Sequence, residues 1–266
     1  MSGFVEKGAA CGCLLALFAC SGQPPTNDPN ADGLGLKVLV PASLGQPSIL
    51  VFTKTAGFRH DSIPDGITAL KALAVQNGFG VTWTEDATQF TDQALASFAA
   101  VVFLSTTGDI LIAAQEAAFE RYIAAGHGYV GIHAAADCEY AWPFYGGLVG
   151  AYFAGHSQIV PASVKLEPVT HASLSGVPSP WQRTDEWYGF SVNPRPQVTV
   201  LLTVDESTYD AAQGKMGPDH PVAWYHPYQG GRAFYTALGH TSESFSDPIF
   251  RGHLLGGIQW AAGIVQ

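Results

Sequence analysis

Short, continuous apolar runs separated by helical patterns constrain the fold of this chain most strongly. Residues 48–52 (SILVF), 100–105 (AVVFLS) and 128–132 (GYVGI) have the length of strands and little polar alternation, which is typical of parallel strands covered on both faces. A further strand is expected at residues 79–85. Because helical patterns separate these runs, right-handed crossovers should join them. The sequence therefore predicts an α/β fold with a mostly parallel sheet and helices on both faces.

Capping signals bound the expected helices. Ser62, with Pro64 in the first turn and Asp65 three residues after the serine, is a helix-start pattern, and Asn77-Gly78 ends that helix. Further helices are expected at residues 88–98, 112–125 and 248–262. The second half of the chain is richer in strands, the last two forming a hairpin, at residues 162–169, 185–192, 197–207, 221–228 and 232–238.

The composition limits the classes of partner. Of the 266 residues, 47% are hydrophobic and only 13% are charged, so the chain can bury a large core, and we expect one large domain. The formal net charge is −10 and the sequence has no Lys/Arg cluster, which excludes a nucleic-acid-binding face. A neutral, polar small molecule fits this charge balance better.

The N-terminal segment differs from the rest of the chain. Residues 8–19 are small and leucine-rich, long enough for the core of a signal peptide and too short to span a bilayer. Leu-Phe-Ala-Cys at residues 17–20 resembles a bacterial lipobox, in which Cys20 is lipidated. The sequence thus predicts a signal and lipoprotein segment at residues 1–20, export, and attachment to the cell envelope only through a lipid on Cys20. An ordinary cleaved signal or a misplaced start codon is the alternative.

The next segment is a tether. Residues 21–47 are rich in Pro, Asn, Asp and Gly, and we expect a linker and lead-in there, with folded structure beginning near Leu36 and the domain proper at residues 48–266. Cys11 and Cys13 would leave with the signal. The mature domain would then keep only Cys138 and could form no internal disulfide.

Polar side chains follow the ends of several expected strands, which is where parallel sheets bind ligands. His60 follows the first strand, His133 follows the fourth, and His240 follows the late strand at residues 232–238. Imidazoles and carboxylates act as general acids and bases when chain-distant groups converge. The expected catalytic residues are His133, His240, Asp137 and Glu243. The other histidines are expected to be structural, namely His127, His171, His220, His226 and His253.

Residues suited to sugar binding lie near these positions. Carboxylates accept hydrogen bonds from hydroxyl groups, a guanidinium can fork onto oxygens, and an aromatic face can pack on a sugar ring. An ordinary edge strand and a loop ion pair are the structural alternatives for these segments. The expected substrate-binding residues are Arg59, His60, Asp61, Asp185, Glu186, Trp187, Tyr188 and His156.

Three of the histidines also suit a metal. His60, His133 and His240, with a carboxylate, match the donor set of Zn²⁺ or another divalent cation with an open position for water or a sugar oxygen. The sequence has no HExxH or His-x-His motif, so this expectation depends on convergence in the fold. A metal-free site, in which His133 and His240 transfer protons beside a ketone, is equally compatible with the sequence.

The chain resembles the ThuA-like (trehalose utilisation) family in several ordered segments. These include FTKTAGFRHDSI, GYVGIHAAADCEYAWPFYGGLVGAYFAGH, TDEWYGF, DESTYD and DHPVAWYHPYQGGRAFYTALGHTSESFSDPIFRGHLLGGIQWAAG. The resemblance implies a class I glutamine amidotransferase-like fold, a flavodoxin-like three-layer sandwich. In that comparison His133 occupies the elbow position of the amidotransferase cysteine, and His240 matches the catalytic histidine, with Glu243 one place further on. Glutaminase activity is therefore not expected.

The resemblance implies a role in the metabolism of trehalose-type sugars or 3-keto-sugars. The expected activity is that of a lyase, hydrolase or isomerase using histidine acid/base or metal-assisted chemistry. Two alternatives stay open: a non-catalytic carbohydrate-binding or scaffold protein, and a hydrolase that uses Cys138 as its nucleophile with His133 as the base.

Overall fold

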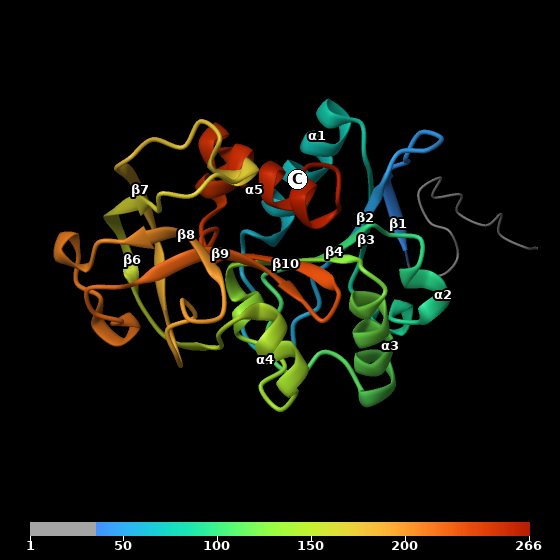
Figure 1. Ribbon diagram of the computed structural model, residues 1–266, viewed down its shortest axis with the longest axis horizontal. Coiled ribbons are helices and arrows are strands. Elements are labelled where there is room, and N and C mark those ends of the chain that lie inside the picture. Colours follow the sequence, from blue (N-terminus) through green and yellow to red (C-terminus); the bar gives the residue numbers. More distant parts are fainter. Residues whose placement is uncertain (1–35) are drawn as a thin grey trace, which may run out of the picture.

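A ten-stranded mixed sheet organises residues 36–266, the part of the chain that the computed structural model describes (Figure 1). In spatial order its strands are β1 (Lys37–Val40), β3 (Gly80–Thr84), β2 (Ser48–Phe52), β4 (Ala100–Leu104), β5 (Gly128–Ile132), β10 (Gly231–Thr236), β9 (Pro221–Tyr228), β8 (Thr199–Val204), β6 (Phe153–Leu166) and β7 (Trp181–Phe190).

The prediction of a mostly parallel sheet was wrong, because five of the nine neighbouring pairs are antiparallel. The four parallel pairs are confined to β3, β2, β4, β5 and β10. The β9–β10 hairpin turns the chain back at Gln229 and Gly230, and β8, β6 and β7 then extend the sheet in antiparallel pairs. The periodicity of a buried strand does not reveal its direction, whereas a tight turn requires an antiparallel neighbour.

Helices cover both faces of the parallel part of the sheet. Figure 1 shows α1 (Ile63–Asn77) and α5 (Pro248–Ala261) above the sheet, and α3 (Ala113–Ala124) and α4 (Pro143–Val149) below it. The apolar stripe of α1 is buried at Leu70, Leu73 and Ala74. The α/β class predicted from the sequence is therefore confirmed. The parallel strands and the helices on their two faces form three layers.

Two details of the helices differ from the sequence prediction. The expected helix at residues 88–98 is instead a 3-10 turn followed by the short α2 (Asp92–Leu95), because the Thr91 hydroxyl accepts a hydrogen bond from Ala94 N and starts a new helix. Ser62 does precede α1, but its hydroxyl forms no capping bond. It donates to the carbonyl of Gly239, 3.3 Å away, and so ties the start of α1 to the loop after β10.

The N-terminal predictions lie largely outside the described residues. Residues 1–35 include the expected signal segment, Cys20 and the first part of the linker. Strand β1 begins close to Leu36, where folded structure was expected. Among residues 36–266, no helix is long and apolar enough to cross a membrane.

Candidate functional site

Three histidines meet beyond the C-terminal ends of parallel strands. His60 lies in the loop after β2, His133 directly follows β5, and His240 lies four residues beyond β10. Strands β5 and β10 are hydrogen-bonded neighbours, with Thr236 opposite Ile132, so the chain leaves both strands at the same edge. The imidazole of His60 packs edge-on against the rings of His133 and His240, with ring centroids 4.7 and 5.0 Å away.

His133 sits in an unusual backbone conformation. Its φ of 51° falls in the left-handed region, which costs a side-chain-bearing residue about 1 to 2 kcal/mol. The side chain is fully buried, and its Nδ1 lies 2.7 Å from the carbonyl oxygen of Ala237. Because a carbonyl can only accept, Nδ1 carries a proton and donates it to Ala237, and Nε2 faces the centre of the site.

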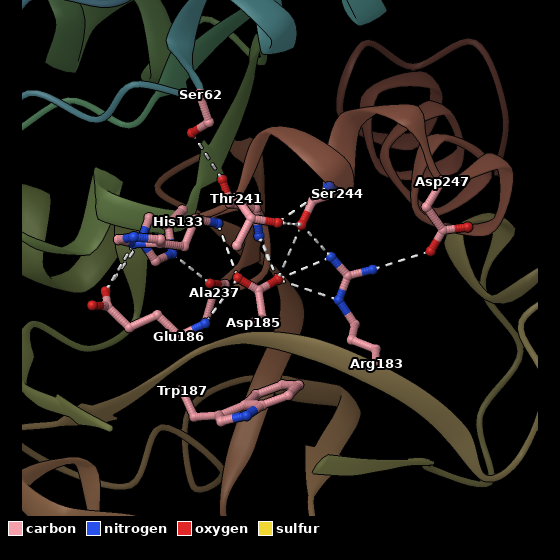
Figure 2. Close-up of polar contacts among 12 residues, drawn as sticks. Ser62, His133, Arg183, Asp185, Glu186, Trp187, Ala237, Thr241, Ser244 and Asp247 are labelled. Carbon is pink, nitrogen blue, oxygen red and sulfur yellow. Dashed lines mark hydrogen bonds and ion pairs between the residues drawn. The ribbon is translucent and has the colours of Figure 1, made fainter. Parts of the chain in front are cut away.

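A carboxylate from β7 completes the group. Glu186 Oε2 lies 3.1 Å from His240 Nδ1 and 3.6 Å from His133 Nε2, which are themselves 3.1 Å apart. The other oxygen, Oε1, lies 2.9 Å from Nδ1 of His156 on β6. Figure 2 shows Glu186 reaching toward His133. The sequence had placed Glu186 among substrate-binding residues; in the structure it lies among the three histidines.

The four side chains have the arrangement of a metal site. One donor atom from each of His60, His133, Glu186 and His240 lies within 4.8 Å of the others. Ligands around a tetrahedral Zn²⁺ are separated by about 3.3 Å, so small side-chain movements would suffice to close the group on an ion. His133 already donates its second ring nitrogen to a backbone carbonyl, as metal-binding histidines usually do. The group could therefore hold a metal.

The electrostatics of His60 and Glu186 favour metal binding. Burial, with the neighbouring His133 and His240, lowers the pKa of His60 to about 3, so that this ring stays neutral. Its Nδ1 is buried and has no hydrogen-bond partner among the described residues. Burial alone would raise the pKa of Glu186, but contacts with His133 and His240 outweigh burial and hold the pKa below its usual range. A neutral histidine with a free lone pair and an ionised carboxylate are the forms that bind metals.

A pocket of about 290 Å³ opens onto this group. Phe58, on the loop after β2, is 67% exposed at the pocket, whereas Tyr188 is buried in its wall. Burial raises the pKa of Asp137, and a hydrogen bond from Tyr140 opposes that rise. The lining includes no lysine or arginine, and it consists of Phe58, His60, Asp137, Phe153, His156, Glu186, Tyr188 and His240.

Comparison with known proteins now identifies the family. The sequence profile described as trehalose utilisation (ThuA) matches residues 48–261. The chain belongs to the ThuA family. No curated protein matches it in sequence at a significant level.

Solved structures share the fold of this ThuA-family chain. A ThuA-like protein from Bacteroides uniformis is 22% identical, with a TM-score of 0.71, over 83% of this chain and 94% of that one. A ThuA-like protein from Parabacteroides merdae is 20% identical, with a TM-score of 0.67, over 82% and 90% of the two chains. A β-galactosidase from Bacillus circulans is 10% identical, with a TM-score of 0.50. The alignment covers 86% of this chain and 31% of the β-galactosidase.

Several residues that the sequence associated with the site lie away from the pocket of this ThuA-family chain. The Arg59 guanidinium pairs with Glu85 at 2.6 Å, while Asp61 and Glu243 are exposed and outside the pocket lining. Asp185 and Trp187 are buried on the opposite face of β7 from Glu186 and Tyr188, because side chains alternate along a strand. Figure 2 shows Trp187 pointing away from the group.

The thiol alternative lacks the geometry that it needs. Cys138 is fully buried, and burial raises the pKa of its thiol to about 12. Its sulfur lies 3.3 Å from the Tyr145 hydroxyl and 3.4 Å from the Thr106 hydroxyl. A reactive cysteine needs a depressed pKa and solvent access, so the placement of Cys138 is that of a structural residue.

Among the aromatic side chains of the ThuA-family pocket, the sequence analysis singled out Tyr188 and missed two. Phe58 and Phe153 line it, yet neither was singled out. Phe58 lies two residues before His60, and a large apolar residue in a polar loop was the available signal.

A larger groove of about 820 Å³, which Leu36 and Thr82 help to line, has no His, Cys, Asp or Glu in its lining, so we place the chemistry at the smaller pocket.

Proposed function

We propose that this ThuA-family protein is a metal-dependent enzyme acting on a trehalose-type sugar or a 3-keto-sugar. The observation that carries the proposal is the convergence of His60, His133, Glu186 and His240 within 4.8 Å at the pocket. The family's link to trehalose utilisation supports the substrate class. The β-galactosidase of similar fold gives no further support for this substrate class, because a likeness at 10% sequence identity concerns the fold alone.

The group would hold Zn²⁺ or another divalent cation. A bound divalent cation polarises a carbonyl oxygen or lowers the pKa of a bound water molecule. Three imidazoles and one carboxylate supply the donors, and the lining contains no lysine or arginine to repel a cation. The roles expected for His133 and His240 as a catalytic pair thereby become those of metal ligands.

Two other side chains would then move protons. His156 is half-exposed, and its Nδ1 donates toward Ser157 O and Glu186, so its Nε2 is available as a base. Asp137 lines the same pocket, and burial raises its pKa. A general acid or base works best when its pKa lies near the working pH.

The pocket walls suit a neutral ring. Phe58 and Phe153 offer apolar faces, while carboxylates and imidazoles accept and donate hydrogen bonds to hydroxyl groups. With a volume of about 290 Å³, the pocket would enclose one sugar ring and leave the remainder of a disaccharide at its mouth.

The test uses purified protein, stripped of metal and then reloaded. Trehalose, its 3-keto form and related sugars are incubated with apo protein, with Zn²⁺- or Mn²⁺-loaded protein, and with His133→Ala and His240→Ala variants. We expect metal-dependent turnover that each substitution lowers by about two orders of magnitude or more. Sugar binding with no turnover under any metal would favour the carbohydrate-binding alternative.

A metal-free mechanism is the second candidate. His240 Nδ1 lies 3.1 Å from Glu186, and although burial lowers the pKa of His240, the hydrogen bond and charge of Glu186 raise it overall. Such a pair is suited to proton transfer without an ion. Turnover that survives complete chelation of metal would favour this mechanism over the first.

We further propose that the protein is exported and anchored to the cell envelope by a lipid on Cys20. The lipobox-like residues 17–20 and the polar segment after them support this. Cys20→Ala should move the protein from the membrane fraction to the soluble fraction of lysed cells. An unchanged distribution would contradict lipid anchoring at that residue.

A further inference from the structure

Asp185 is a carboxylate with no exposed surface, one residue before Glu186 on β7. Its Oδ1 accepts the peptide N–H groups of Glu186 and His240, both at 3.0 Å, and its Oδ2 accepts that of Gly239 at 2.9 Å. Oδ2 also accepts from Nη2 and Nε of Arg183, at 2.9 and 3.2 Å. Figure 2 shows this convergence of donors on one side chain. Asp185 therefore has no free oxygen to offer a substrate.

The same carboxylate joins two segments that no strand pairing connects. Glu186 lies on β7, an edge strand paired with β6, whereas His240 follows β10, which pairs with β5 and β9. The 3.1 Å separation of Glu186 Oε2 and His240 Nδ1 consequently depends on side-chain contacts. Asp185 binds the peptide N–H groups of both residues, so it fixes their backbones relative to each other.

Arg183 anchors Asp185 to the rest of the fold. Its guanidinium lies 4.7 Å from the ring centroids of both Trp181 and Phe250. It also reaches Asp247, the N-cap of α5, at 3.3 Å. A planar guanidinium held in this way cannot easily follow a displaced carboxylate.

We propose that Asp185 is a positioning residue that sets the spacing of Glu186 and His240 and thereby the affinity of the histidine–glutamate group for a divalent cation. This inference rests on the proposed metal site. Asp185 contacts neither the pocket nor the centre of the group; it acts through the two residues whose backbones it holds. Partners of this kind orient metal ligands, and their loss typically weakens metal binding 10- to 100-fold.

Asp185→Asn is the direct test. An amide has one acceptor oxygen, and its NH₂ would face either Gly239 N–H and Arg183 or the N–H groups of Glu186 and His240. Donors would then oppose donors in a buried site. We expect Co²⁺ and Zn²⁺, measured by chelator competition and calorimetry, to bind about 10- to 100-fold more weakly. The visible spectrum of bound Co²⁺ should also change, because the geometry of the ligands changes.

Glu206→Gln is the matched control. Glu206 likewise holds a loop through the peptide N–H groups of Met216 and Gly217 and contacts a buried histidine, His220. It does not line the pocket. A loss of stability without a loss of metal affinity is expected for this variant. Equal weakening of Co²⁺ binding in both variants would overturn the inference, since the effect would then reflect general destabilisation.

The outcomes separate the two proposals. If wild-type protein binds neither Co²⁺ nor Zn²⁺, the proposed metal function fails and this inference fails with it. If wild type binds and folded Asp185→Asn binds equally well, only the positioning role is overturned. If Asp185→Asn does not fold, Arg183→Lys tests the positioning role instead. Lysine keeps the positive charge but cannot donate two hydrogen bonds to Asp185 as the guanidinium does. Metal affinity reduced about 3- to 10-fold supports the proposal, and unchanged affinity overturns it.

Discussion

His133 has a backbone conformation in the left-handed region, which glycine adopts more readily than a residue with a side chain. Such positions persist where the surrounding structure over-determines them, and they are concentrated at functional sites. The imidazole faces Glu186 and His240 because the chain turns sharply there, with φ at 51°, directly after β5. The strained position thus provides the orientation that the proposed metal group needs.

This strain predicts that glycine is more stable than alanine at position 133, the reverse of their order inside a helix. His133→Gly should be more stable than His133→Ala by about 1 kcal/mol, because both lose the imidazole but only glycine adopts this φ without cost. At the exposed, helical Val75 the same pair should rank the other way, with alanine more stable. Urea unfolding of the four variants measures both differences. Alanine more stable than glycine at position 133 would contradict the strained conformation.

Phe58 tests whether the pocket binds a sugar ring. The side chain is 67% exposed and touches the ring edge of His60, with centroids 4.9 Å apart. Phe58→Ala should lower affinity for the sugar about 10-fold by removing an apolar face, while leaving the free energy of unfolding within about 0.5 kcal/mol. Val75→Ala, an exposed apolar truncation outside the pocket, serves as the control. Unchanged sugar affinity in Phe58→Ala would remove Phe58 from the binding site.

Among the elements, the parallel strands were the most predictable part of the site. Buried runs and the rule for strand ends were sufficient to select His60, His133 and His240 from the nine histidines of the chain. The position of β7 was not predictable, because it depends on the long β6, which pairs with β8 near Val164–Leu166 and with β7 along most of its length. Alternation along β7 also could not tell which of Asp185 and Glu186 faces the pocket.

The start of α5 is a second element with a testable role. The Asp247 side chain accepts a hydrogen bond from Ile249 N and pairs with Arg183. Asp247→Ala should lower the free energy of unfolding by about 1 kcal/mol through loss of the cap. Asp247→Asn keeps the capping oxygen and loses only the 3.3 Å contact with Arg183, so it should destabilise the protein less than Asp247→Ala. Equal destabilisation in both variants would show that the ion pair, and not the cap, stabilises this helix.

For the whole molecule, buried histidines outside the site predict sensitivity to acid. Burial lowers the pKa of His253 to about 3 and that of His171 to about 4, so both are neutral in the folded state at neutral pH. In the unfolded chain they take up protons near pH 6.5. Stability should therefore be fully present above about pH 6.5 and be lost as pH falls toward 4, with each histidine costing about 2 kcal/mol at pH 5.

Unfolding in urea at pH 7 and pH 5 measures this loss. His253→Asn retains a donor for Ser173 O, the partner of His253 Nδ1, and cannot titrate. Its stability should consequently fall less between the two pH values than that of wild type, by about 2 kcal/mol. An equal fall in both proteins would show that His253 does not contribute to acid sensitivity.

At the same scale, the sequence predicted the class of fold and missed the balance of strand directions. Apolar runs indicated strands, and helical patterns indicated the covering layers. The antiparallel extension from β9 to β7 is set by turn geometry and long-range pairing, which local patterns report weakly. β7 and the loop after β10 come together only in the assembled sheet. This packing brings Glu186 next to the three histidines.

Crystallographic anomalous scattering from crystals grown or soaked with Zn²⁺ shows whether His60, His133, Glu186 and His240 bind a divalent cation. We expect one ordered anomalous peak within about 2.0 to 2.2 Å of a donor atom from each of His60, His133, Glu186 and His240. A peak elsewhere, or no peak among these four side chains at saturating Zn²⁺, would contradict it.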